Sequence, residues 1–173
     1  KRMRGNIMES LTKENIGFCS VRQLYAEGWH HIFVVNSLVS DTAISNKSRE
    51  YNYVFPLTIH NGGNIESEES RGNNINPVIL ESVVEKIKTK PVDLFHYIYG
   101  ILHSGDYRSR YAAQLRTDFP RIPFPKDSKL FTEISKLGVN LVSLHLLDAS
   151  YPKCSNHIKD VLEKSFLELK VSN

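Results

Sequence analysis

The pattern of hydrophobic residues changes near Pro77, and this change most constrains the fold. Before Pro77, short runs of β-branched and aromatic residues alternate with turn residues, which is typical of strands. After it, apolar residues recur every three or four positions, which is typical of amphipathic helices. Strands followed by helices favour an α+β fold. We therefore predict a small, mostly antiparallel sheet packed with helices, followed by a C-terminal helical hairpin.

Three runs before Pro77 predict strands, over Ile16–Gln23, His30–Leu38 and Tyr51–Ile59. Pro56 lacks a backbone N–H, so the third strand is expected at a sheet edge or at a bulge. Residues 60–76 show no periodicity and are rich in Asn, Gly, Ser and Glu. We predict an exposed loop there.

The second part of the chain predicts helices over Val78–Lys88, Asp93–Ser104 and Tyr107–Arg116, with Pro91 opening the second of them. The three prolines within Phe119–Pro125 fix φ and keep the residues before them out of the helical region, so this segment is expected to be extended.

Asp127 is expected to cap a long helix. Its apolar residues are spaced four and three apart, which is typical of a helix that lies along another helix. They are Leu130, Ile134, Leu137, Leu141 and Leu144. We divide the chain into an α+β domain over residues 1–125 and a helical hairpin or spacer arm over residues 126–173.

Composition excludes several classes of protein. The 173 residues include 40% hydrophobic and 24% charged side chains, near the averages of globular proteins. Apolar runs stay shorter than the roughly 18 residues that a membrane span needs. Two cysteines, Cys19 and Cys154, cannot form a disulfide framework, which indicates a reducing, cytoplasmic location. The chain begins with Lys1, so we expect it to be a piece of a longer protein.

Motifs of catalysis are missing from the sequence, which contains neither a P-loop nor a nucleophile elbow. His30 and His31 are adjacent on a predicted strand and would point to opposite faces. His96 and His103 share a helix face, but seven residues of helix separate them by roughly 10 Å, too far for one metal ion. We expect a non-catalytic chain that binds no metal and no cofactor.

Three groups of segments together resemble one family. The first comprises residues 15–17 and 20–23, and the second comprises residues 29–34, 44–47 and 53–57. The third is the most specific and reads FHYIYGILHS (95–104), YRSRYA (107–112), DFPRIPFP (118–125) and LHLL (144–147). Together they resemble the C-terminal target-recognition (specificity) domain of type ISP and type IIG restriction–modification enzymes.

The resemblance implies sequence-specific recognition of double-stranded DNA by the specificity part of a bacterial restriction–modification protein. It also implies that an adenine methyltransferase and a nuclease or helicase belong to the same polypeptide. S-adenosylmethionine and magnesium are then expected for that parent enzyme only, not for this chain.

Candidate DNA-binding residues are the polar and basic side chains near predicted strand ends, loops and the basic stretch 108–126, where five cations face one acidic residue. They are Arg22, Ser45, Asn46, Lys47, Arg49, Arg71, Asn73, Asn74, Arg108 and Arg110. The stretch 45–49 is equally consistent with a capped turn. Arg108 and Arg110 are equally consistent with intramolecular partners of Asp106 and Asp118.

Two other functions fit the sequence less well. The helical hairpin could be the working surface of a protein-interaction module that does not bind DNA. The chain could also be a small enzyme with an unrecognised site, which would require a pocket with two or more perturbed titratable groups.

Overall fold

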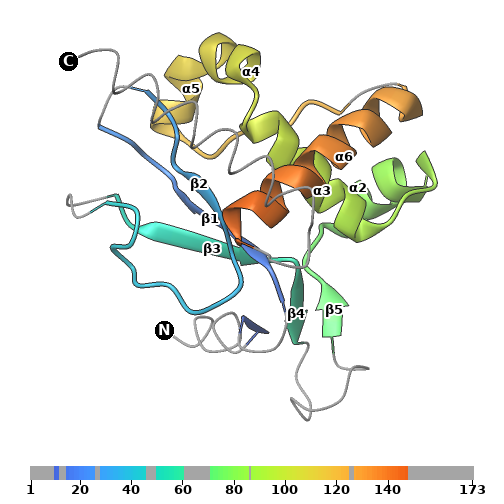
Figure 1. Cartoon of the computed structure of the whole chain (residues 1–173), viewed down its shortest axis with the longest axis horizontal. Helices are drawn as coiled ribbons and strands as arrows, with labels where there is room; N and C mark the ends of the chain where they lie inside the picture. The colour runs from blue at the N-terminus through green and yellow to red at the C-terminus, as the bar shows by residue number, and fades with distance from the viewer. Residues whose placement is uncertain are drawn as a thin grey trace.

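A computed structural model describes residues 10–11, 15–25, 28–45, 50–60, 71–85, 87–124 and 127–147 (Figure 1). From residue 15 onwards strands come first along the chain and helices follow, so the predicted α+β class is confirmed. The second helix of the predicted hairpin falls within residues 148–173, which lie outside the described residues.

Three strands form an antiparallel sheet in the order β2-β1-β3. They span Gly17–Val21 (β1), Ile32–Val35 (β2) and Asn52–Pro56 (β3). Strand β3 lies at the edge of this sheet and ends at Pro56, which confirms the expected place of the proline. The neighbouring strand β1 lies so close that a Cβ atom on Gly17 would be 2.9 Å from the Cα of Pro56.

The predicted third strand is two strands, and part of the predicted loop is a strand. After β3, strand β4 (Thr58–His60) pairs antiparallel with β5 (Arg71–Asn73) in a separate two-stranded sheet. Pro56 cannot donate a backbone hydrogen bond, and the chain changes partner there. The Leu57 amide donates to the Ile16 carbonyl over 2.7 Å, which fixes β4 at the beginning of β1.

The helices begin at Pro77 as predicted, but their boundaries differ. Helix α2 (Pro77–Ile79) continues into the π-helical turn η2 (Leu80–Glu85), where one regular helix was expected. The expected helix Tyr107–Arg116 is two short helices, α4 (Gly105–Arg110) and α5 (Ala112–Thr117). Tyr111 separates them with φ −108° and ψ 18°, outside the helical region.

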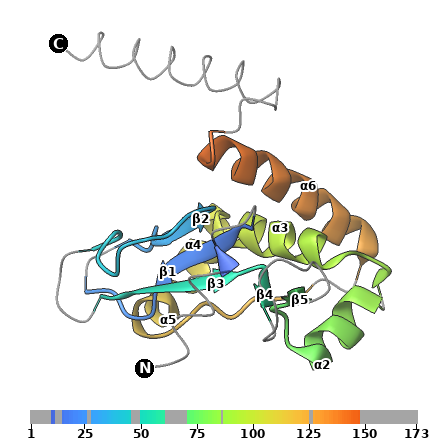
Figure 2. The ribbon, with the colours of Figure 1, turned by 90° about the horizontal axis from the view of Figure 1, so that it is seen from below.

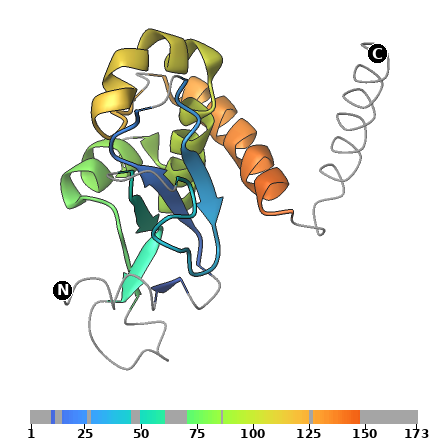
Figure 3. The same ribbon diagram turned by 90° about the vertical axis from the view of Figure 1, so that its left-hand side faces the viewer.

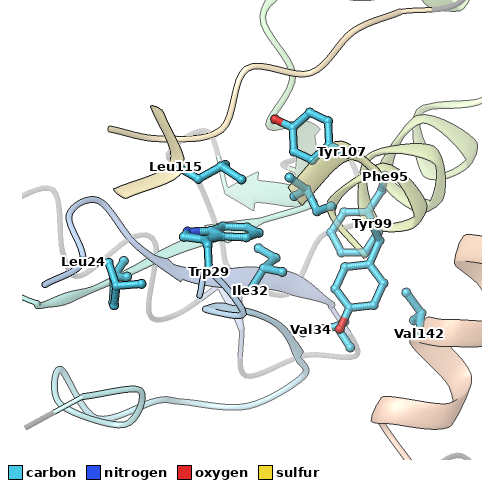
Figure 4. Packing of buried hydrophobic residues seen from close by; sticks show 11 residues of the cluster. Leu24, Trp29, Ile32, Val34, Phe95, Tyr99, Tyr107, Leu115 and Val142 are labelled. Carbon is cyan, nitrogen blue, oxygen red and sulfur yellow. Dashed lines mark hydrogen bonds between the residues drawn. The ribbon is translucent and has the colours of Figure 1, made fainter. Parts of the chain in front are cut away.

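Helix α3 (Pro91–Leu102) occupies the centre of the core. Asp93 caps its first turn by accepting hydrogen bonds from the Thr89 hydroxyl and the Lys90 amide. Towards the sheet, Phe95 stacks on Phe18 of β1 with ring centroids 3.9 Å apart. Figure 4 shows Phe95 and Tyr99 of α3 between residues of the sheet and Val142.

Helix α6 (Ser128–His145) lies along α3 (Figure 2), which confirms that the long helix packs on another helix. It also runs beside β2 (Figure 3), and Val142 belongs to the main hydrophobic cluster. Residues 128–145 therefore share the core of the preceding residues. The division of the chain between residues 125 and 126 stays a prediction.

The side of α6 that is buried matches the predicted seam only in part, since Ile134 and Leu141 of the seam pack against the core. Its buried residues are Phe131, Ser135, Gly138, Val142 and Ser143, while Leu130 and Leu137 are 47% and 62% exposed. The two helices are so close that a Cβ atom on Gly138 would lie 1.9 Å from the His96 carbonyl oxygen. A pattern of large apolar residues cannot predict such a contact, because small residues create it.

Candidate nucleic-acid interface

Arg22 and Asp118 join the end of β1 to the turn after α5. The Arg22 Nε donates to Asp118 Oδ1 over 2.9 Å, and both side chains are more than half exposed. The Arg22 guanidinium also lies 6.0 Å from the centre of the Phe119 ring. The pKa of Asp118 is lowered by the Phe119 backbone N–H, and further by Arg22 and Arg121. The carboxylate is therefore ionised at neutral pH.

Two more arginines lie close to this ion pair. Arg116, in the last turn of α5, accepts a backbone hydrogen bond from the Leu24 amide over 3.0 Å, which places α5 beside the segment after β1. Arg121 is near enough to Asp118 to influence its pKa. We refer to Arg22, Arg116, Asp118 and Arg121 as the Arg22 cluster. Each is exposed, so the cluster presents three cations and one anion to solvent.

The surface beside the cluster offers both polar and aromatic groups. A hollow of about 390 Å³ is lined by Gln23, Leu24, Tyr25, Ala113, Arg116 and Thr117. On the other side, Phe119 packs edge-on against Tyr53 and Phe55 of the edge strand β3. These two aromatic side chains are 43% and 41% exposed. Guanidinium, amide and aromatic groups are those that proteins use on nucleic acids.

Arg108 is used inside the domain. Its guanidinium and Nε donate to the Leu102 carbonyl and to the Nδ1 atoms of His30 and His103, over 2.7, 2.9 and 3.0 Å. It also lies 5.7 Å from the centre of the buried Trp29 ring. Burial lowers the pKa of this guanidinium. The partners are therefore histidines and a carbonyl, and neither of the acids considered from the sequence, Asp106 and Asp118, is among them.

Arg110 is placed differently from Arg108. It is exposed in the last turn of α4, and no hydrogen bond joins its side chain to another residue that the structure describes. Its predicted contact with DNA stays a prediction.

The predicted cluster at residues 45–49 is only partly described, since Asn46, Lys47 and Arg49 lie outside the described residues. The Ser45 hydroxyl donates to the carboxylate of Glu50. Glu50 is buried and also accepts a hydrogen bond from the Tyr25 amide over 2.7 Å. Ser45 is therefore anchored to the segment that follows Arg22.

Arg71, Asn73 and Asn74 lie at the other end of the sheet. Asn73 pairs with Thr58 in the β4–β5 hairpin, and the Asn74 side chain donates to the Pro56 carbonyl over 3.0 Å. Figure 1 shows this hairpin at the opposite end of the long strands from α4 and α5. The five residues of β1 separate the two ends by roughly 15 Å. The predicted site residues therefore fall into two groups.

Cysteine and histidine side chains make no metal centre among the described residues, where no group of three or more His, Cys, Asp or Glu could hold an ion. Cys19 is buried, and burial raises the pKa of its thiol to about 11, as expected for an inert cysteine. His103 and His145 lie with their ring centres 5.0 Å apart beside Tyr99 and Arg108. None of the described helices is long and apolar enough to cross a membrane.

Sequence reasoning selected Arg22 but did not select Arg116, Asp118 or Arg121. The basic stretch 108–126 contains all three, so the charge pattern gave a signal. What it could not show is that α5 and the segment after it return to the end of β1, where Arg22 lies.

Comparisons with known proteins assign nearly the whole chain to one family. The model of the family described as the Type ISP C-terminal specificity domain matches residues 1–168. A comparison with curated proteins finds no match.

Three solved structures share the fold. They are a DrdV–DNA complex (TM-score 0.64, 24% identity), a nuclease-deletion mutant of the Type ISP enzyme LlaGI with a DNA substrate mimic (0.54, 24%) and the ATP-dependent Type ISP enzyme LlaBIII bound to DNA (0.58, 20%). The matches cover 83%, 78% and 78% of this chain but only 13%, 10% and 8% of those proteins. The length of the family match decides the assignment: this chain belongs to the Type ISP C-terminal specificity domain family.

Proposed function

We propose that this specificity domain recognises target sequences in duplex DNA and that the Arg22 cluster lies on its DNA-contacting surface. The observation that carries this proposal is that Arg22, from the end of β1, lies on one exposed surface with Arg116, Asp118 and Arg121, from the segment about 95 residues later, and that Arg22 and Arg121 both act on the Asp118 carboxylate. Phosphate contacts by such cations position a protein on DNA, and adjacent polar side chains then reach base edges. Gln23 and Thr117 line the hollow beside the cluster and provide such groups.

The chain's place in a larger enzyme is part of the same proposal. Its match covers 13% of the DrdV chain, and the family is described as a specificity domain. We propose that this chain is non-catalytic and that methylation and cleavage belong to other domains of the same polypeptide. S-adenosylmethionine and magnesium would be bound by those domains.

A salt titration tests the proposed surface. Binding of a random-sequence duplex by the chain, followed by fluorescence anisotropy, should weaken steeply as salt increases, because phosphate contacts release counterions. Arg116→Ala and Arg121→Ala should each weaken binding to all sequences alike and reduce the slope of log K against log salt by about 1. Lys136→Ala removes an exposed cation from α6 and is the matched control, expected to leave the slope unchanged.

Two results would contradict the proposal. One is an absence of binding to duplex DNA at low salt, which would favour the protein-interaction module. The other is a loss of affinity in Arg116→Ala and Arg121→Ala that is no larger than in the Lys136→Ala control. DNA would then contact another surface of the domain.

A further inference from the structure

We infer that Arg22 is a specificity-determining residue that reads a guanine of a G·C pair, and that Asp118 is the residue that positions it. This inference rests on the proposed function, because it assigns a base contact within the surface proposed to face DNA. It separates Arg22 from the other arginines of the cluster, which would contact phosphates.

The hydrogen bonding of the Arg22 guanidinium group leaves its terminal nitrogens available to a base. Asp118 accepts from the Nε of Arg22, and no hydrogen bond joins its two terminal nitrogens to any other residue that the structure describes. Those two nitrogens form the end of a planar fork. A fork of this kind donates to O6 and N7 of guanine together, the commonest specific contact of the major groove.

The Arg22 side chain is also held in one orientation before DNA binds. A long exposed side chain loses conformational entropy when a ligand fixes it, and a side chain that is already fixed loses less. Arg22 is held from two directions, by the carboxylate of Asp118 and by the face of the Phe119 ring. Arg116 donates to a backbone carbonyl, that of Tyr25, over a longer 3.4 Å. Among the described arginines of the cluster, Arg22 thus has the closest side-chain restraint.

Folding stability does not account for the Arg22–Asp118 ion pair. Its two side chains are 56% and 55% exposed, and solvent-exposed ion pairs contribute little to folding. Asp118 also places a negative charge on a surface that is proposed to face phosphates, which costs affinity for DNA in general. A carboxylate there is useful if it orients a base-reading arginine and discourages other contacts of that arginine.

Selection of bound duplexes from a randomised library tests the inference. The wild-type chain should recover a motif in which one position prefers G·C by about 5-fold or more, since a bidentate pair discriminates by about 1–3 kcal/mol. Arg22→Gln should remove the preference at that position and leave the rest of the motif. Asp118→Asn keeps the size of the side chain but removes its charge, and it should weaken the preference at the same position.

The matched control is Arg121→Ala, which should lower affinity for every duplex and leave the motif unchanged. Thermal unfolding of each variant confirms that the fold persists. If Arg22→Gln also lowers affinity uniformly, or if the wild type selects no G·C position that depends on Arg22, the inference is overturned while DNA binding stands. If none of the chains binds duplex DNA, the proposed function itself fails.

Discussion

Arg22 and Arg108 show how differently one domain uses the same guanidinium group. Arg108 lies beside the buried Trp29 and donates to a carbonyl and two imidazoles, so it joins α4 to the end of α3 and to the segment before β2. Arg22 lies in solvent and keeps one exposed carboxylate as its partner. Both were candidates for DNA contact from the sequence. The comparison indicates that the partners of an arginine, more than its local charge, distinguish the internal contacts of Arg108 from the DNA contact that we propose for Arg22.

The largest expected difference between the two regions is in stability. Arg108→Ala should lower the free energy of unfolding by about 2–3 kcal/mol, because it removes charge-assisted hydrogen bonds and leaves the Leu102 carbonyl and His103 without their donor. Urea denaturation measures this loss. Arg110→Ala, on the exposed face of the same helix, is the matched control and should change stability by less than about 0.5 kcal/mol. If Arg108→Ala and Arg110→Ala were equally stable, the structural role assigned to Arg108 would be wrong.

Lowering the pH should reduce the stability contributed by the Arg108 region but not that contributed by the Arg22 region, and this effect should be smaller than that of Arg108→Ala. Burial, together with Arg108 and His145, lowers the pKa of His103 from 6.5 to about 4. The folded state therefore binds fewer protons than the unfolded state between these values, so stability is complete above pH 6.5 and declines as the pH falls towards 4. We expect a loss of about 1–2 kcal/mol over this range, after allowance for the solvent that reaches the ring.

The contribution of the Arg22–Asp118 pair to stability should not change in the same pH interval, because the pKa of Asp118 is lowered and its carboxylate stays ionised. Urea denaturation at several pH values measures the effect. His103→Gln should reduce the decline between pH 4.5 and 6.5 without removing it, because burial also lowers the pKa values of His31, His96 and His145. A variant that keeps the full decline would assign it to other groups, with His145 the next to test, since burial and Arg108 lower its pKa as well.

The smallest expected effect is that of Arg22 on folding. Arg22→Ala should shift the unfolding midpoint no more than the Arg110→Ala control does, since the ion pair is exposed to solvent and screened by salt. Its cost should be seen in DNA binding instead. A clear loss of stability in Arg22→Ala would show that the pair holds the turn after α5 in place, and the contrast with Arg108 would weaken.

The elements whose signal is local were predicted well. The edge position of Pro56 and the start of α6 after Asp127 follow from the chemistry of single residues, a missing N–H and a capping carboxylate. The division of Tyr51–Ile59 into β3 and β4 was not predicted. It depends on the pairing of residues 58–60 with residues 71–73, and periodicity carries no information about such a partner.

Burial on α6 illustrates the same limit. Leu137 was expected in the helix contact because it is large and apolar, yet it is 62% exposed while Gly138 beside it is buried. The distance between the backbones of α3 and α6 decides this, and that distance is set by which small residues face one another.

The sequence by itself determined the class of the fold, the order of its main elements and the family resemblance, because these depend on composition, spacing and motifs within short segments. Only the tertiary structure decided which arginines share a surface. Arg22 and Asp118 are 96 positions apart along the chain, and Arg108 reaches His30 across 78. A guanidinium group takes its role from the groups within a few ångströms of it, and folding alone brings those groups together.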